Sequence, residues 1–178
     1  KHLLGRNCPH SIIFNLLFAE KYGVKTVVPS LKPIAAWLAL SENDIRDEIL
    51  KRTPLILIQH GDPDSLTIST RCQLLREYAQ KYETGDIAND SLDHRALWMF
   101  AHDDLADTIH EVWQRCDLYN FRGDLIRLIR EGKIAACTNL VAQVATDANA
   151  NDYHRIVAIQ ALTNCKDTAT LEMLAHNL

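Results

Sequence analysis

Apolar residues recur at helical spacing along most of this chain, and the pattern is clearest near its C-terminal end. There Arg155, Ala158 and Leu162 fall on one helical stripe, and the small Ala161 allows a neighbouring element to approach closely. After a short polar break the helical period resumes at Leu171, Leu174, Ala175 and Leu178. Two such helices cannot bury their apolar faces alone, so the pattern predicts one hairpin of a stacked helical repeat.

The rest of the chain shows the same period in shorter segments. Every proline lies at or before Pro63, and only three glycines follow residue 64, which favours one helix after another. We expect helices over residues 10–21, 34–40, 42–52, 55–58, 93–101, 104–116, 122–130 and 135–147, and in the terminal hairpin. A further helix of about fourteen residues is expected between 58 and 93, with Leu74, Leu75 and Tyr78 on its inner face. Residues 24–28 could form a strand, but the pattern offers no second strand to pair with it. The predicted fold class is therefore all-α, an α-α superhelix of HEAT-like helical repeats.

Four residues are expected to begin or end these helices. Gly23 is placed to end the first helix, Pro33 to open the second at its first position, and Ser41 to cap the third. Thr70 is a candidate cap for the following long helix, with Gln73 as its capping-box partner. Two later helices carry clean apolar stripes, one with Leu105, Ile109, Val112, Trp113 and Cys116 and one with Leu140, Val141, Val144 and Ala145.

Residues 85–91 make the best candidate linker, because they are mostly polar and follow a glycine. We therefore expect two parts, a helical junction segment over residues 1–84 and the start of a helical-repeat solenoid over residues 92–178. Within the second part, the expected hairpins Asp124–Ala148 and Asp152–Leu178 lie about 28 residues apart, which is shorter than a regular HEAT unit of ~40–47 residues.

The composition and charge of the chain exclude few classes of function, but they disfavour nucleic acid as a partner. With 178 residues, the chain can form one domain or two small ones without a disulfide or a metal. Its net charge of -4 gives no general reason to expect nucleic acid as a partner. Between Glu83 and Glu111, eight acidic residues stand against the single basic residue Arg95. An acidic patch repels phosphate backbones, although a solvated helix face with its caps is the commoner origin of such a run.

The cysteines and the hydropathy of the sequence indicate the cellular compartment of the protein. Cys8, Cys72, Cys116, Cys137 and Cys165 are scattered without a Cys-x-x-Cys pair, which predicts buried free thiols in a reducing compartment. The longest apolar run, 34–40, is too short to cross a bilayer, and no leader is apparent. We therefore expect a cytoplasmic protein without membrane association. Because the chain begins at Lys1 without an initiator Met and ends with a hairpin, we also expect a piece of a longer polypeptide.

Common nucleotide and hydrolase motifs are missing from the sequence. It contains no Gly-x-x-x-x-Gly-Lys-Ser/Thr, Gly-x-Gly-x-x-Gly, Gly-x-Ser-x-Gly or His-Glu-x-x-His. ATP binding by this segment is not expected, and no catalytic, cofactor-binding or metal-binding residue is predicted. The sharpest competing hypothesis is an HD-type metal-dependent phosphohydrolase, using His60 or His94, His102 with Asp103, and Asp147 or Asp152. The simpler interpretation places Asp103 or Asp104 at a helix cap.

Three further sets contain metal-ligand side chains: His94, His102 and His110; Cys8 and His10; and Asp62, Asp64 and Ser65. The three histidines recur every eight residues, so they would point in different directions on a helix. The second set lacks another ligand pair for zinc, and the third lacks the loop length and closing glutamate of an EF-hand. A zinc site is therefore not expected, and the third set is expected to form a turn.

Aromatic and basic side chains could contribute to a binding face. The three tryptophans sit among aliphatic residues at helical spacing, which predicts core anchors instead of ligand cages: Trp37, Trp98 and Trp113. Six basic residues could line one face and bind phosphate or an acidic peptide: Arg115, Arg122, Arg127, Arg130, Lys133 and Arg155. Acidic residues interleave with them, which favours paired surface charges.

Several segments taken together resemble a specific family. They are Phe18, Tyr22-Gly23, Val27 to Ala39, Ile45-Arg46, Pro54, Gly61 to Leu66, Arg71 and Leu74-Leu75, followed by Arg155, Ala158, Ala161, Leu162, Asp167 and Leu171. The first group is similar to a segment of large bacterial NACHT-like STAND ATPases that lies between the nucleotide-binding module and the helical repeats. The second is similar to the first HEAT-like repeats that follow. The chain departs from the family in lacking a nucleotide site, and the resemblance transfers no catalytic residue.

The resemblance implies a non-catalytic part of a signalling switch. In that family the repeats sense a target and the ATPase module oligomerises, and many members are implicated in defence against phage. It implies that this segment contacts a protein partner or flanking domains of the same chain, carries no cofactor, and oligomerises through the ATPase module. Two alternatives stay open, a freestanding α-helical protein-binding scaffold without a switch and the HD-type hydrolase.

Overall fold

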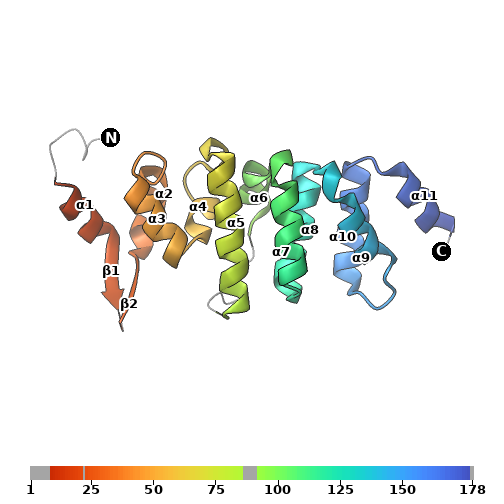
Figure 1. Ribbon diagram of the computed structural model, residues 1–178, viewed down its shortest axis with the longest axis horizontal. Coiled ribbons are helices and arrows are strands. Elements are labelled where there is room, and N and C mark those ends of the chain that lie inside the picture. Colours follow the sequence, from red (N-terminus) through yellow and green to blue (C-terminus); the bar gives the residue numbers. More distant parts are fainter. Residues whose placement is uncertain (1–8, 22, 86–91, 177–178) are drawn as a thin grey trace. The chain divides into compact units, whose positions relative to one another are not determined.

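Helices make up most of the chain in a computed structural model, which describes residues 9–21, 23–85 and 92–176. The chain forms two compact units, Lys1–Leu66 and Thr67–Leu178. Figure 1 labels the elements in chain order. The mostly helical content agrees with the all-α prediction, and one short pair of strands is the exception within the described residues.

The N-terminal unit begins with a helix that is shorter than expected. α1 (His10–Leu17) is followed directly by strand β1 (Phe18–Lys21), which pairs antiparallel with β2 (Val24–Val27). The expected helix over 10–21 is therefore wrong from Phe18 onward, and residues 24–28 do have a partner strand. Phe18 and Val27 are opposite each other in the pair, and both are buried. Gly23 adopts a left-handed φ of 76° in the turn instead of ending the helix.

Short helical segments complete this unit: η2 (Pro29–Leu31), α2 (Lys32–Leu38), α3 (Asn43–Arg52), α4 (Leu55–Gln59) and η3 (Pro63–Ser65). α2 begins two residues before the predicted range of 34–40, and Pro33 takes its second position instead of the first. The apolar segment expected after Pro54 is confirmed, since every side chain from Leu55 to Ile58 is buried. Gly61 lies so close to α2 that a Cβ there would be 3.0 Å from the Ala36 Cβ.

Two of the predicted helix caps are wrong. The Ser41 hydroxyl donates to the Leu38 carbonyl oxygen, and α3 starts without a side-chain cap. The long helix α5 (Ile68–Glu83) is capped by Thr67 instead of Thr70, because the Thr67 hydroxyl accepts a hydrogen bond from the Thr70 amide. Thr67 has the extended backbone that the N-cap position requires, whereas Thr70 is already inside the helix.

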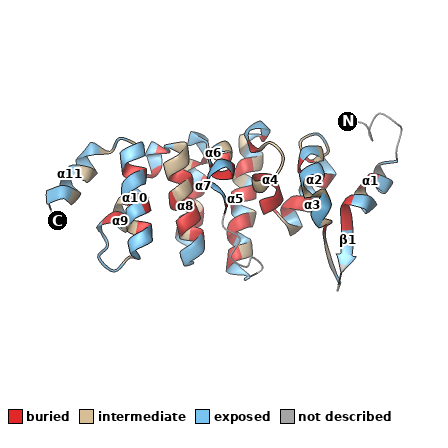
Figure 2. Ribbon diagram, turned by 180° about the vertical axis from the view of Figure 1, so that it is seen from behind, coloured by how far each residue is buried: buried red, intermediate tan, exposed pale blue. Residues whose placement is uncertain are grey.

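The C-terminal unit consists of helices packed against one another. After α5 come α6 (His94–Phe100), η4 (Asp103–Leu105), α7 (Ala106–Arg115), α8 (Tyr119–Gly132), η5 (Ala135–Cys137), α9 (Thr138–Thr146), α10 (Asp152–Asn164) and α11 (Thr168–His176). α8 packs against both α6 and α10, α7 packs against α5, and α9 packs against α10. Buried residues alternate with exposed ones along each of the longer helices (Figure 2).

The predicted apolar stripes of this unit are largely buried. The five stripe residues from Leu105 to Cys116 are in the core, and the stripe of α9 is buried except for the half-exposed Val144. On α10, Ala158, Ala161 and Leu162 have no exposed surface. α11 differs, since none of its residues is buried. Leu178 lies outside the described residues.

Two of the three tryptophans are on the surface. Trp37 is 56% exposed and Trp98 is 63% exposed, whereas Trp113 is 8% exposed. The prediction of three core anchors is therefore wrong for the first two. Each lies on a short helix whose buried face is already filled, by Ala35 and Ala36 on α2 and by Ala96, Leu97 and Phe100 on α6.

Two helices of this unit end in the same backbone conformation. Lys133 follows α8 and Lys166 follows the end of α10, with left-handed φ values of 53° and 59°. In each case the next amide donates to the carbonyl oxygen five residues earlier: Ile134 to Ile129, and Asp167 to Leu162. This is the hydrogen bond of a Schellman motif, which satisfies carbonyl groups that a helix end leaves unpaired.

The connections within the unit also recur. η4 runs directly into α7, and η5 runs directly into α9. The two left-handed lysines are about 33 residues apart, so the predicted hairpin spacing of about 28 residues is too short. The difference arises because α8 begins at Tyr119, five residues before the predicted hairpin start at Asp124.

The predicted linker falls mostly on residues 86–91, which lie outside the described residues. α5 belongs to the same compact unit as the helices that follow it and packs against α7. The division into parts 1–84 and 92–178 stays a prediction. None of the helices in the described ranges is both long and apolar enough to cross a membrane.

Candidate functional site

The histidines of the hydrolase hypothesis each have a local environment of their own. His60 lies in the N-terminal unit, where burial and then the charge of Lys32 lower its pKa. His94 Nε2 lies 3.0 Å from Glu131 Oε2. His102 accepts a hydrogen bond from the Asp104 amide through Nδ1, so it caps η4 in the place expected for an aspartate.

The acidic candidates are exposed residues near helix ends. Asp103, Asp147 and Asp152 are all exposed, and Asp147 accepts a hydrogen bond from the amide two residues later. In the Asp62 turn, the Ser65 hydroxyl donates to the Asp62 carboxylate at 2.5 Å, as the turn interpretation predicts. Cys8 and the side chain of His10 lie outside what the structure describes. Among the described residues, no three His, Cys, Asp or Glu side chains are grouped to hold a metal ion.

The cysteines within the described ranges are free thiols. Cys116 and Cys137 are buried, as predicted, while Cys72 and Cys165 are half buried. Burial raises the pKa of Cys137 to about 12, so its thiol stays protonated, and it donates weakly to the Ala106 carbonyl oxygen at 3.7 Å.

Most of the six basic residues are paired, as the interleaved charges predict. Arg115 lies 3.2 Å from Glu83 and 3.8 Å from Glu111. The remaining pairs are Arg127 with Asp124, Arg130 with Glu131, and the longer Arg155 with Asp152. Arg122 instead lies over the Trp113 ring, with 4.0 Å from its guanidinium carbon to the ring centroid. The set therefore does not form a continuous cationic face.

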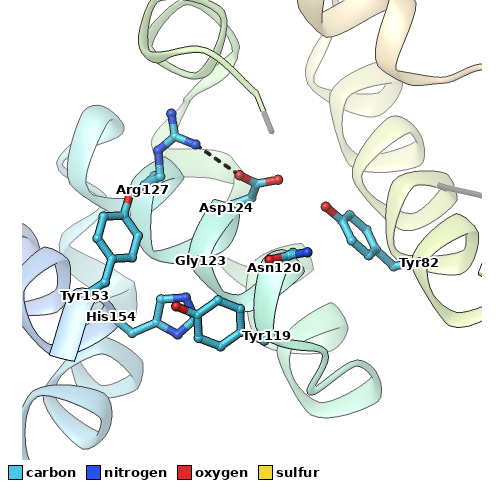
Figure 3. A pocket seen from close by; sticks show the side chains of 8 residues that line it. All are labelled: Tyr82, Tyr119, Asn120, Gly123, Asp124, Arg127, Tyr153 and His154. Atoms are coloured by element: carbon cyan, nitrogen blue, oxygen red, sulfur yellow. Dashed lines mark hydrogen bonds and ion pairs between the residues drawn. The ribbon is translucent and has the colours of Figure 1, made fainter. Parts of the chain in front are cut away.

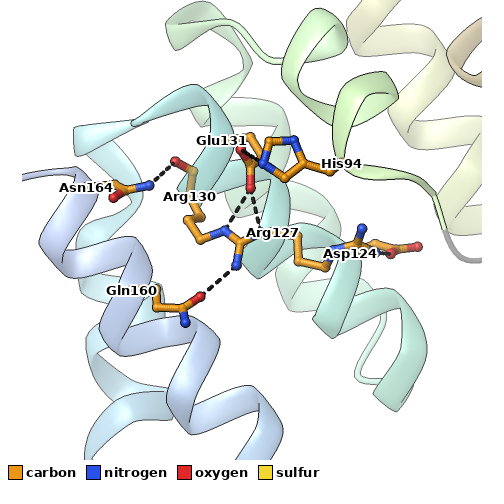
Figure 4. A network of polar contacts seen from close by, with 7 residues as sticks. All are labelled: His94, Asp124, Arg127, Arg130, Glu131, Gln160 and Asn164. Atoms are coloured by element: carbon orange, nitrogen blue, oxygen red, sulfur yellow. Dashed lines mark hydrogen bonds and ion pairs between the residues drawn. The ribbon is translucent and has the colours of Figure 1, made fainter.

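One polar network joins α6, α8 and α10 (Figure 4). Glu131, whose side chain is almost buried, contacts His94 through one oxygen and Arg130 through the other, at 3.0 and 2.6 Å. Arg130 also donates to the Gln160 side-chain oxygen at 2.7 Å, and the Asn164 amide donates to the Arg130 carbonyl oxygen at 3.3 Å. The network holds three helices together and leaves no carboxylate facing solvent alone.

A cleft of about 360 Å³ lies along α8 (Figure 3). α5 contributes Tyr82 and α10 contributes Tyr153 and His154 to its walls. The lining residues from α8 are Tyr119, Asn120, Gly123, Asp124 and Arg127. Their spacing of one helical turn places them on a single stripe of α8. The cleft thus combines aromatic surfaces with a few polar groups, the usual makeup of a binding site.

Asp124 is the buried charge beneath this cleft, at 5% exposure. The Tyr78 hydroxyl donates to its Oδ2 at 2.5 Å, and Arg127 Nη1 donates to its Oδ1 at 3.2 Å. Burial raises the pKa of Asp124, and these two partners oppose that rise. Burial, and then the Asp124 charge, raise the pKa of Tyr78, so its phenol keeps the donated proton. Arg127 balances Asp124, so the cleft carries hydrogen-bonding groups without a net charge.

His154 is packed into the same cleft and is 7% exposed. Its ring stacks on Tyr119 with 4.1 Å between centroids and 19° between planes. A Cβ at Gly123 would lie 2.8 Å from His154 Nε2, so only glycine permits this approach without a shift. Burial lowers the pKa of His154, which favours the neutral ring. Within the described part of the chain, its ring nitrogens have no hydrogen-bond partner.

A second cleft of about 330 Å³ adjoins the first and shares Tyr119 and His154 with it. Its further lining residues are Trp113, Asp117, Arg122, Ile126, Val144, Asp147, Ala150 and Asn151. The Tyr119 hydroxyl donates to the Asn151 side-chain oxygen at 2.9 Å, and that oxygen also accepts the Tyr153 amide in the cap of α10. The stacked pair therefore forms a wall common to both clefts.

Comparisons with known proteins were negative. No protein-family model matches the chain. No curated protein and no solved structure matches it either.

Proposed function

We propose that this chain is a non-catalytic, protein-binding segment of HEAT-like helical repeats in a bacterial signalling protein of the NACHT-like STAND type. The observation that carries the repeat assignment is the recurrence of one helix end, at Lys133 and again at Lys166. Proteins built from stacked helix pairs present long surfaces to partners, and binding is their usual role. We assign the segment to the cytoplasm, with its partner a protein or a flanking domain.

The repeat unit in this proposal is a helix, a short turn and a second helix. The pairs are α6 with α7, α8 with α9, and α10 with α11. The short 3-10 turns η4 and η5 hold equivalent places before α7 and α9. The packing of α8 between α6 and α10 supports the assignment, because the first helices of successive pairs are then neighbours.

The two clefts are the binding region in this proposal. Tyrosine and arginine are enriched in protein interfaces because each offers a large contact area with hydrogen-bonding groups. The first cleft contains three tyrosines and Arg127, which is oriented by its bond to Asp124. An arginine already held in place loses little side-chain freedom when a partner binds.

The STAND assignment rests on the resemblance in sequence, which concerns mainly structural positions. Arg71 illustrates this, since it is 2% exposed and donates to the carbonyl oxygens of Met99, Phe100 and Ala101 at the end of α6. We propose that the segment transmits a sensed signal to an ATPase module that oligomerises, with phage defence as the biological setting.

The first test is the coding sequence on both sides of this segment. A phosphate-binding loop encoded upstream and further helix pairs downstream are the expected result. A stop codon directly after Leu178 together with no ATPase module upstream would leave a freestanding scaffold.

The second test is hydrogen exchange on the full-length protein with and without ATP. A switch predicts that nucleotide changes the protection of amides in α8 and α10. A scaffold predicts the same exchange in both conditions, and that result would contradict the signalling role.

A further inference from the structure

We propose that the two adjoining clefts form one peptide-binding groove, in which the second cleft receives a lysine or arginine side chain of an extended partner segment. This inference rests on the proposed function, protein binding at these clefts, and adds the chemistry of the ligand. Three observations support it: a histidine whose ring has no hydrogen-bond partner among the described residues, a net negative charge on the lining of the second cleft, and the absence of net charge in the neighbouring cleft.

His154 offers a hydrogen-bonding edge to the groove. Its ring has no hydrogen-bond partner in the described ranges, and it lines both clefts. The described side-chain atoms that are buried without a partner lie elsewhere, at Thr53 Oγ1 and Arg155 Nε, so the ring nitrogens of His154 are open to the groove. Stacking on Tyr119 fixes the ring without using its nitrogens. A peptide group in the groove would supply the missing hydrogen bond, as donor or acceptor according to the tautomer.

The charges of the second cleft select a basic side chain. Asp117 and Asp147 are exposed on its lining, and neither forms a close ion pair with another described residue, although the charge of Asp117 acts on Arg122. Arg122 is the third charged residue of that lining, and its guanidinium is held over the Trp113 ring. The lining therefore has two carboxylates and one cation, a net charge of about -1 at neutral pH.

The first cleft does not require a charged residue in the rest of the bound partner segment. Its Asp124 and Arg127 neutralise each other, and its walls include Tyr82 and Tyr153. An uncharged or aromatic residue of the partner segment fits this composition, because peptide groups and aromatic rings can both pack against tyrosine rings. An acidic segment is disfavoured across the groove, since it would meet two carboxylates and only one cation in the second cleft.

The test uses the full chain, labelled with ¹⁵N, and three matched peptides. Each is acetyl-Gly-Gly-Tyr-Gly-X-Gly-Gly-amide, where X is arginine, glutamine or glutamate. We expect all three to shift the amide signals of Gly123 and His154, and the arginine peptide to bind tightest and to shift Ala150 most. Added salt should reduce the preference for arginine over glutamine, because the selected charges are exposed.

Variants separate the charge contribution from the groove itself. Asp117→Asn and Asp147→Asn should each weaken the arginine peptide about two- to fivefold, the range of an exposed ion pair, and leave the glutamine peptide unchanged. Asp107→Asn removes the same charge from an exposed position outside both clefts and should change neither. His154→Phe keeps a ring beside Tyr119 and should weaken all three peptides alike.

The outcomes that contradict the inference are distinct. If the glutamate peptide bound as tightly as the arginine peptide, the ligand class would be wrong while the groove and the proposed function stood. If no peptide shifted Gly123, His154 or Ala150, the groove itself would be wrong. The signalling role would then still depend on the hydrogen-exchange experiment, which does not involve these peptides.

Discussion

α10 and α11 carry similar apolar spacing, yet one is a core helix and the other is not. α10 buries five residues, including Leu162, whereas α11 buries none and leaves Leu171 and Leu174 half exposed. α10 packs against both α8 and α9, while the main contact of α11 in the described chain is with α10. The comparison shows that spacing determines which face of a helix is apolar, and that neighbours determine how far this face is buried.

The largest expected effect in this comparison comes from α10. Leu162→Ala should lower the free energy of unfolding by about 2–5 kcal/mol, because it leaves a cavity at a side chain with 0% exposure. The measurement is urea denaturation followed by circular dichroism. An unchanged midpoint would show that Leu162 is not a core position and that the α10 helix faces another way.

The second effect concerns the polar contact beneath the α8–α10 cleft. Tyr78→Phe should cost about 1–3 kcal/mol of unfolding free energy, because the buried Asp124 loses a hydrogen-bond donor. Tyr119→Phe is the matched control, since its hydroxyl donates to Asn151 at an exposed site, and it should cost about 0.5 kcal/mol. Equal losses for the two variants would mean that burial of the Tyr78 bond does not matter.

The third effect tests the close approach of α8 and α10. Gly123→Ala should destabilise the chain by about 1 kcal/mol, since overpacking against His154 outweighs the helix preference of alanine. It should also displace the His154 ring, which NMR of the ring protons beside Tyr119 would detect. Adding His154→Ala to Gly123→Ala should relieve the overlap, so losses that simply add would argue against direct contact.

The fourth effect is a pH dependence from the same histidine. Burial lowers the folded-state pKa of His154 below its unfolded value of 6.5, so the unfolded chain binds more protons between these two values. Stability should therefore fall as the pH drops below about 6.5 toward the folded pKa. His60 shifts in the same direction, so the comparison needed is native against His154→Phe. Identical slopes of unfolding free energy against pH would contradict this assignment.

The smallest expected effect belongs to α11. Leu174→Ala should lower the unfolding free energy by at most about 1 kcal/mol, because the side chain is already half exposed. The same denaturation experiment measures it beside Leu162→Ala. A loss as large as that of Leu162→Ala would mean that α11 is covered in solution by something the described chain does not provide.

The helices were largely predictable from the sequence because their signal is local. Periodic stripes such as Leu105 to Cys116 depend only on residues one turn apart, and they are buried as expected. The β1–β2 hairpin was not predictable in this way. Phe18 fits the helical spacing of the residues before it, and only its pairing with Val27 makes a strand the better solution.

The local sequence pattern also did not predict which side of a helix faces the core. Trp37 lies in a nearly continuous apolar run, so hydropathy alone cannot say which side faces the core. The structure buries the small Ala35 and Ala36 and exposes the indole. Tight packing against Gly61 favours small residues on the inner face of α2.

The candidate site was only weakly predictable from the sequence. Asp124 lies on the apolar face of α8, three residues after Phe121 and four before Leu128. The sequence therefore shows a carboxylate at a position where the helical period predicts a core residue. Its partner Tyr78 is far away in the chain, and no spacing rule connects the two. The role of His154 depends on a glycine in another helix, which only the packed structure reveals.

The left-handed lysines have a consequence for how such a chain can lengthen. Because Lys133 and Lys166 close their helices with the same hydrogen bond, a copied stretch from one lysine to the next would start and finish in matching backbone conformations. A tandem duplication of that stretch in the gene would then add two helices, copies of α9 and α10, without requiring a new turn. Growth in such units would extend the binding surface while leaving the existing groove intact.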